Sequence, residues 1–226
     1  MRSKGRGRLA VTLTALLIGA VLAAAPVQAG LAGCSPDWSE PQAELYATDN
    51  TAIIGDPTDP RLEDRLQLFE FQVDATVLGN GGLPAGSTLL DGVFWSSELQ
   101  RATYERSRDF HLQCVGDLEL HAIAAQVREQ FHQESVLVFA YRRQGAPDAD
   151  AVTLEVPDVD PNRFYDALAG DPLARARLGG GSVTERHTLI LVADVGDLGV
   201  ARSLATQAGG QAGAAAVRYG HREFVE

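Results

Sequence analysis

The stretch that decides the fold is FHLQCVGDLELHAIAAQVREQFHQESVLVFAY, residues 110–141. Its first residues alternate between apolar and polar, which predicts a strand that ends before Gly116. After Asp117, a good helix N-cap, apolar residues recur with helical spacing at Leu120, Ile123, Ala124, Val127 and Phe131. A run rich in β-branched and aromatic residues, 135–141, follows. The stretch therefore predicts strand, turn, helix and strand.

A similar pattern lies 80 residues further along the chain. Val115-Gly116-Asp117-Leu118 recurs as Val195-Gly196-Asp197-Leu198, and the same offset aligns Phe110 with Ile190. Self-similarity at a fixed distance indicates an internal duplication.

The second copy predicts the same local structures as the first. Residues 188–193 predict a strand, and Asp197 is the expected cap of a helix over residues 198–208. Residues 216–224 predict a final strand.

Upstream segments complete the second half. Residues 152–156 predict a strand, and Asp160 with Pro161 predicts the start of a helix over 161–169. Residues 174–178, a turn at Gly179–Gly181 and the residues from Ser182 onward predict a hairpin.

The first half has matching segments. Residues 44–48 predict its first strand, and residues 87–95 with 102–114 predict the hairpin. Residues 62–77 fit a helix and a strand equally well, and we expect a helix because the position in the unit requires one.

The order strand-helix-strand-strand-helix-strand, used twice, is the split βαβ pattern of ferredoxin-like domains. We therefore expect an α+β fold of tandem ferredoxin-like (βαββαβ) units, with antiparallel sheets and helices on one face. The strand expected at residues 186–193 is apolar on both sides, so we expect two sheets to pack together. The expected divisions are a signal peptide 1–29 (to 33 in a lipoprotein), a lead segment 30–43, the first unit 44–143, a linker 144–151 and the second unit 152–226.

The first thirty residues have the order of a secretory signal peptide. Four cations precede an apolar run over residues 9–25, and Val27-Gln28-Ala29 places short residues before a cleavage site between Ala29 and Gly30. No later segment is long and apolar enough to cross a bilayer, so we expect an exported protein that is otherwise soluble.

The chain contains only two cysteines, Cys34 and Cys114, and the fate of Cys34 has two alternatives. Leu31-Ala32-Gly33-Cys34 resembles the lipobox of bacterial lipoproteins, in which the cysteine is lipidated. Otherwise, Cys34 and Cys114 would form a disulfide in an oxidising compartment. The lipid anchor is the preferred alternative, which places the protein on the outer face of a membrane; the disulfide would accompany a periplasmic or secreted soluble protein.

The formal net charge is −11, from 19 Lys and Arg against 30 Asp and Glu. Four of the cations lie in residues 1–8, so an exported chain is more acidic still. Such a surface repels phosphate backbones, which excludes nucleic acid as an expected partner. Membrane contact is expected only through a lipid on Cys34.

The first half resembles a family of small exported bacterial domains of unknown function, many of them lipoproteins. The resemblance covers residues 44–141 and rests mainly on Tyr104-Glu105-Arg106-Ser107 and on Phe131-x-Gln133-Glu134-Ser135-Val136. It implies the fold and export, and lipidation of Cys34, but no chemistry. In this chain Ala47-Thr48 follows Tyr46, where the family tends to carry Phe-Gly.

Three side chains are weak catalytic candidates. His111 and His221 alternate with apolar strand residues and could face the open side of a sheet as general bases, although ordinary half-exposed histidines are the preferred interpretation. Arg106 could anchor an anion, although pairing of the repeated Glu-Arg across strands is the preferred interpretation. Gln133 and Ser135 could line a pocket, but the end of a helix is the commoner place for such residues.

No metal or cofactor is expected, because the chain lacks Cys-x-x-Cys, paired His, phosphate-loop and dinucleotide motifs. The first hypothesis is therefore a non-catalytic exported domain that binds an envelope protein or a small ligand, with a homodimer possible. The alternative is a small-substrate enzyme that uses a cavity between ferredoxin-like sheets, as in the dimeric α+β barrels. A pocket lined by His111, Arg106 or His221 would favour the enzyme.

Overall fold

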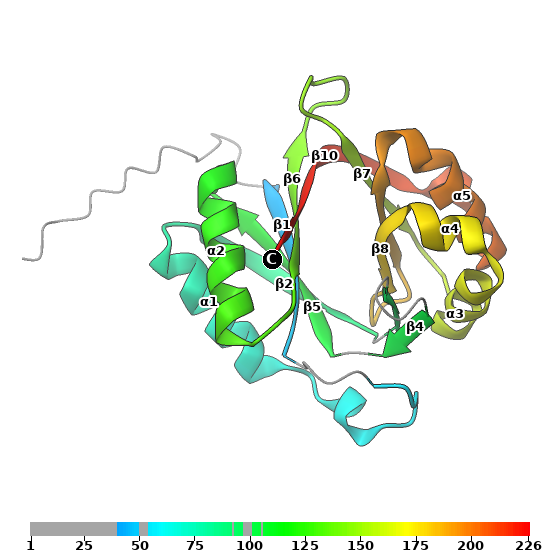
Figure 1. Ribbon diagram of the computed structural model, residues 1–226, viewed down its shortest axis with the longest axis horizontal. Helices are drawn as coiled ribbons and strands as arrows, with labels where there is room; N and C mark the ends of the chain where they lie inside the picture. Colours follow the sequence, from blue (N-terminus) through cyan, green and yellow to red (C-terminus); the bar gives the residue numbers. More distant parts are fainter. Residues whose placement is uncertain (1–39, 50–53, 92, 97–100, 105) are drawn as a thin grey trace, which may run out of the picture. The chain divides into compact units, whose positions relative to one another are not determined.

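The computed structural model describes residues 40–49, 54–91, 93–96, 101–104 and 106–226. It shows an α+β fold in which an eight-stranded antiparallel sheet carries helices on its outer side (Figure 1). The elements are β1 (Ala43–Thr48), a 3-10 turn (Pro60–Glu63), α1 (Gln67–Gly79), β2 (Leu83–Leu90), β3 (Val93–Ser96), β4 (Arg101–Tyr104), β5 (Ser107–Gln113), α2 (Asp117–Gln130), β6 (Val136–Arg142), β7 (Ala151–Val156), α3 (Pro161–Gly170), α4 (Pro172–Arg177), β8 (Leu178–Val183), β9 (Leu189–Asp194), a 3-10 turn (Val195–Asp197), α5 (Leu198–Gln207), a 3-10 turn (Ala212–Ala214) and β10 (Ala216–Val225).

The strand order of the sheet is β2-β5-β1-β6-β10-β7-β9-β8. Strand β10 pairs with β6 from Tyr219–Arg142 to Val225–Val136, which joins the two halves of the chain into one sheet. Strands β3 and β4 form a separate hairpin.

The two edge strands of this sheet, β2 and β8, meet at one end. Leu90 and Thr184 form a bridge, and the Asp91 amide donates to the Val183 carbonyl at 2.6 Å. The Glu185 amide donates to the Leu89 carbonyl at 3.0 Å. The sheet therefore curls back on itself, with an outer face under the helices and an inner face.

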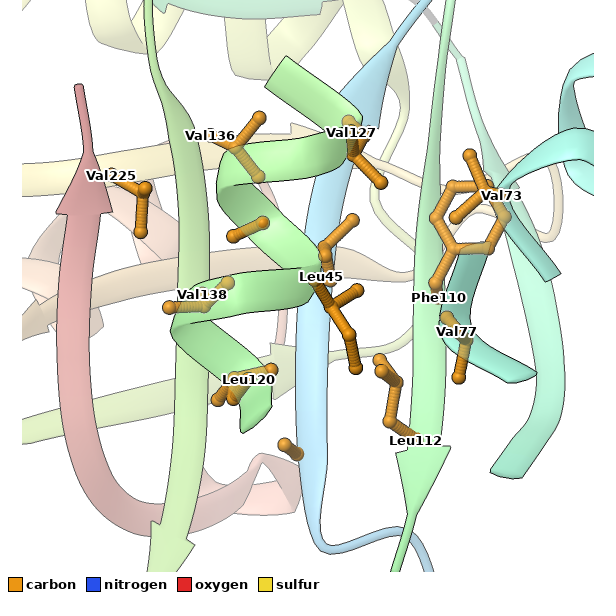
Figure 2. Close-up of a cluster of buried hydrophobic side chains, with 14 of the residues drawn as sticks. Leu45, Val73, Val77, Phe110, Leu112, Leu120, Val127, Val136, Val138 and Val225 are labelled. Carbon is orange, nitrogen blue, oxygen red and sulfur yellow. The ribbon is translucent and has the colours of Figure 1, made fainter. Parts of the chain in front are cut away.

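The outer face of the first half packs against α1 and α2. Alternate residues of its strands, such as Leu45, Phe110 and Val138, meet the buried sides of the two helices (Figure 2). Phe69 and Val73 are buried on α1, so the helix expected for this ambiguous segment is confirmed.

The outer face of the second half has its own core under α3, α4 and α5. Leu154 and Leu191 of the sheet pack with Phe164 of α3 and Leu204 of α5. The expected cap of α3 is confirmed: Asp160 Oδ1 accepts from the amides of Asn162 and Arg163. Within the described ranges, no helix has the length and apolarity that a bilayer span needs.

The hairpin expected around the three glycines is wrong. Residues 172–177 are helical because Asp171 caps α4 through the Ala174 amide at 2.9 Å, with Pro172 at the first position. Gly179–Gly181 lie inside β8, where they give room to side chains: a Cβ on Gly181 would lie 2.7 Å from Leu191 Cδ2. The glycines allow side chains to pack closely against β8, and the turn lies instead at residues 184–188.

The N-cap position expected for Asp197 is confirmed, but the N-cap position expected for Asp117 and the side-chain capping hydrogen bonds expected for both residues are wrong. Gly116 is the N-cap of α2, while Asp117 lies in the first turn and accepts from Arg142 at 2.6 Å. Asp197 precedes α5 but its side chain makes no capping hydrogen bond, because a 3-10 turn already leads into the helix.

The alignment of Phe110 with Ile190 is wrong by one residue. Phe110 and Leu112 face the helices, whereas Val192 lies in the small inner cluster with Phe139 and Ala151. Val195–Asp197 form a 3-10 turn before α5, whereas Asp117 and Leu118 lie inside α2, so the matching Val-Gly-Asp-Leu runs occupy different places in the two halves. Arg186, expected in a strand, lies in the exposed turn before β9.

Candidate functional site

The inner face of the first half is polar along β1 and β5. Because Leu45, Phe110 and Leu112 face the helices, their neighbours point to the other side of the sheet. These neighbours are Glu44 and Tyr46 of β1 with Asp109 and His111 of β5. Strand pairing places Glu44 opposite His111 and Tyr46 opposite Asp109.

Neighbouring strands add three further side chains to this face. Tyr141 comes from β6, Glu155 from β7 and Arg218 from β10. Arg218 Nη1 donates to Tyr141 Oη at 3.0 Å, and Arg218 Nε lies 3.5 Å from Glu155 Oε1. We call the seven residues the inner polar cluster: Glu44, Tyr46, Asp109, His111, Tyr141, Glu155 and Arg218.

Glu44 is the centre of the inner polar cluster. It is 3% exposed, and Tyr46 and Tyr141 each donate a hydrogen bond to one of its carboxylate oxygens. Burial raises the pKa of Glu44, and the two tyrosine hydrogen bonds oppose that rise by favouring the anion. Burial also raises the pKa of both tyrosines, with the nearby carboxylates adding to the effect, so the phenols remain donors.

Asp109 is the least satisfied member of the cluster. The residue is 2% exposed, and among the described residues its Oδ1 has no hydrogen-bond partner. Burial raises the pKa of Asp109 well above its ordinary value, and the negative charges of Glu44 and Glu155 raise it further, while Arg218 opposes the rise. A buried carboxylate oxygen without a partner costs free energy, so this position favours a proton or a bound cation.

His111 connects the cluster to solvent. Its side chain is 27% exposed, and its Nε2 lies 3.3 Å from Thr88 Oγ1. Its Nδ1 has no hydrogen-bond partner among the described residues and lies 3.9 Å from Glu44 Oε1. Burial lowers the pKa of His111, so the neutral imidazole is favoured at neutral pH.

Of the three catalytic candidates, the structure places only His111 in the inner polar cluster. Arg106 binds Asp49 at 2.6 Å and Asp64 at 3.0 Å, which satisfies its charge elsewhere. His221 lies on the outer face and contacts Asp150 at 2.8 Å. Gln133 Oε1 accepts from the Thr48 amide at 3.1 Å, so this residue ties the loop after α2 to β1.

The processing residues Ala29, Gly30 and Cys34 lie outside the described residues. Cys114 is buried and disulfide-bonded.

Two surface hollows lie away from the carboxylates of the cluster. One, of about 330 Å³, is lined by Glu40, Pro41, Gln42, Val115, Ala140, Tyr141 and Arg142. The other, of about 460 Å³, is lined by Arg163, Asp166, Ala167, Gly170, Gln207 and Gly209. Neither lining includes His111, Arg106 or His221, so neither is the pocket that would favour an enzyme.

Comparison of the chain with protein-family models, with curated proteins and with solved structures finds no match. The inner polar cluster therefore carries the functional argument by itself.

The sequence interpretation missed Glu44 and Asp109. A signal was present, since Glu44-Leu45-Tyr46 and Asp109-Phe110-His111 both place an acidic residue on the polar side of a buried strand. The alternation alone does not identify a site, because the pairing of the two strands, which brings the polar sides together, cannot be taken from spacing along one chain.

Proposed function

We propose that the protein is an exported cell-envelope protein, built from two ferredoxin-like units, that binds a small cationic ligand on the inner face of its sheet without catalysing a reaction. The observation that carries the binding role is the buried Asp109 carboxyl with its unpartnered oxygen in a polar cluster that reaches solvent at His111.

The strand order supports the two ferredoxin-like units. In each half the order is fourth, first, third, second: β6-β1-β5-β2 and β10-β7-β9-β8. In each half, helices follow the first and third of these strands. This is the arrangement that the split βαβ pattern produces.

The buried residues of α2 and α5 support a duplication with an offset of 81 residues. Leu120, Ile123, Ala124 and Val127 are buried in α2, and residues 201, 204 and 205 of α5 and its C-cap residue 208 are buried in the second half. The same offset aligns Phe110 with Leu191, and both residues face the helices. The four identical residues at an offset of 80 are weaker evidence for which residues correspond in the two halves, because the pattern of burial along strands and helices defines structural equivalence.

The amino-terminal pattern and Cys114 support export. A disulfide persists in oxidising compartments outside the cytoplasm, and Cys114 is disulfide-bonded in a chain whose other cysteine is Cys34. A disulfide at Cys34 would exclude its lipidation, and the intact mass of protein from the native host separates the two fates. For export itself, residues 1–40 fused to a reporter that is active only outside the cytoplasm should give activity; an uncleaved cytosolic chain would contradict export.

The charge of the cluster supports a cationic ligand. Glu44, Asp109 and Glu155 supply carboxyl groups, and Arg218 is the cation nearest to them in the described part of the chain. A ligand with positive charge or several N–H donors would complete the unpartnered oxygen of Asp109 and offset the repulsion among the carboxylates.

The test is thermal unfolding of the purified protein with a panel of small amines, guanidinium compounds and divalent metal chlorides. At least one member should raise the unfolding temperature of the wild type and have little effect on Asp109→Asn. Asp150→Asn is the matched control, because Asp150 is an exposed carboxylate on the outer face beside His221. Stabilisation that survives in Asp109→Asn, or none with any compound, would contradict the proposed site.

His111 favours the enzyme alternative. It is a partly exposed, neutral imidazole beside carboxylates, which is the state a general base requires. The curled eight-stranded sheet is also similar to the arrangement in which dimeric α+β barrels hold small substrates. Turnover of a bound compound that is lost in His111→Gln, with binding retained, would establish this alternative.

A further inference from the structure

We propose that the ligand of the inner polar cluster is a divalent first-row transition metal ion, held by Glu44, Asp109 and His111. The proposal rests on the binding role proposed above and specifies its chemistry. The three side chains offer two carboxylate oxygens and one imidazole nitrogen, and these donor atoms all lie within 4.8 Å of one another.

The geometry of the three donors is close to a coordination sphere. Ligands about 2.0–2.2 Å from a tetrahedral Zn²⁺ lie about 3.3–3.6 Å from each other. Donors within 4.8 Å can reach that spacing by side-chain rotation without movement of the strands, because β1 and β5 hold Glu44 directly opposite His111.

The contacts around the three residues resemble the supporting contacts of a metal site. Thr88 Oγ1 lies 3.3 Å from His111 Nε2, so an N–H at Nε2 can donate to it and leave the lone pair of Nδ1 for a metal. Nδ1 is the nitrogen near Glu44 and has no hydrogen-bond partner among the described residues. Tyr46 and Tyr141 orient the Glu44 carboxylate from both oxygens.

The unpartnered Oδ1 of Asp109 is an independent observation that points to a ligand. The residue is 2% exposed, so water does not replace the missing partner at low cost. A divalent cation would bind this oxygen and, at the same time, neutralise the charges of Asp109 and Glu44. Two carboxylates with one imidazole suit Zn²⁺, Mn²⁺ or Fe²⁺ better than Ca²⁺, which takes oxygen ligands alone.

The second half does not repeat this set of donors. The offset of 81 residues aligns Asp109 with Ile190 and His111 with Val192, and Thr153 pairs with Val192 as Glu44 pairs with His111. Two of the three positions therefore carry apolar side chains, and we expect one metal ion to bind to the described part of the chain.

The experiment measures metal binding to the full exported chain after treatment with a chelator. Isothermal titration with ZnCl₂ and with MnCl₂ should show one ion per chain. Asp109→Asn and His111→Gln should each weaken binding at least about tenfold, and Thr88→Val, which removes only the supporting contact, should weaken it by about 10- to 100-fold. The matched control is His221→Gln, because His221 and Asp150 form an exposed histidine–carboxylate pair on the outer face.

A measurement on the unmodified protein keeps the test independent of folding in the variants. X-ray absorption of the zinc form should show only O and N ligands near 2.0–2.2 Å, with scattering from one imidazole. Absence of binding, or binding that is lost in His221→Gln and kept in Asp109→Asn, would overturn the metal site. Stabilisation by an organic amine without metal binding would overturn the metal proposal alone, whereas loss of all ligand effects would overturn the proposed function as well.

Discussion

Gly220→Ala tests the pairing that joins the two halves into one sheet. Gly220 lies in β10 opposite Tyr141 of β6, and a Cβ there would lie 2.3 Å from Phe139 Cε1 and 2.5 Å from the Ala140 carbonyl oxygen. The phenylalanine ring can rotate, but the carbonyl belongs to a paired strand and cannot move alone. We expect a loss of about 1–3 kcal/mol in the free energy of unfolding, the range for an added methyl group in a packed interior.

Urea denaturation followed by circular dichroism measures this loss. Gly213→Ala is the matched control, because a Cβ at Gly213 meets no atom within 4 Å. The control should be neutral or more stable by up to about 1 kcal/mol, since alanine restricts the unfolded chain. If Gly220→Ala behaves like Gly213→Ala, β10 does not lie against β6 and the single sheet is wrong.

Two further predictions concern the cluster and a helix cap. Tyr141→Phe removes the hydroxyl that joins Glu44 to Arg218. We expect the free energy of unfolding, measured by urea denaturation, to fall by about 1.5–3 kcal/mol, because both partners of the hydroxyl are charged. A loss below about 0.5 kcal/mol, the size typical of surface substitutions, would show that the network is not formed. Asp171→Ala should lower the free energy of unfolding by about 1 kcal/mol, and Asp171→Asn should lower it much less, since both Asp and Asn cap helices. The hydrogen bond from the Ala174 amide lowers the pKa of Asp171. The stabilisation of the folded state by this cap should therefore be fully present above the ordinary carboxyl pKa and decline as the pH falls through the lowered pKa. An equal loss of stability for both variants at neutral pH would contradict the capping role.

Local patterns predicted most elements because they depend on residues near each other in the chain. The helical spacing from Leu120 to Val127 predicted α2 and its buried side, and Asp160-Pro161 predicted the start of α3. The failures are also local in origin. The glycine run at Gly179–Gly181 has the composition of a turn, and only the side chains packed against it, Leu191 and Phe164, show why a strand needs glycine there.

The candidate site could be predicted only in part. The sequence identified His111 by its place among apolar strand residues, but His221 was equally plausible on that criterion, and Arg106 was a candidate through the repeated Glu-Arg. Asp49 and Asp64 neutralise Arg106, and the helices pack on the same side of the sheet as His221, which makes that side the outer face. Both facts depend on residues distant in the chain.

The sequence by itself determined the α+β character and the presence and buried sides of α1, α2, α3 and α5, because hydrophobic periodicity is set within a few residues. Only the tertiary structure decided that the strands form one sheet, that β2 meets β8, and that Glu44, Asp109 and His111 face one another. Those facts depend on strand register and on the curl of the sheet. Both result from the packing of the whole chain, and a shift of one residue in register would turn each of these side chains to the opposite face.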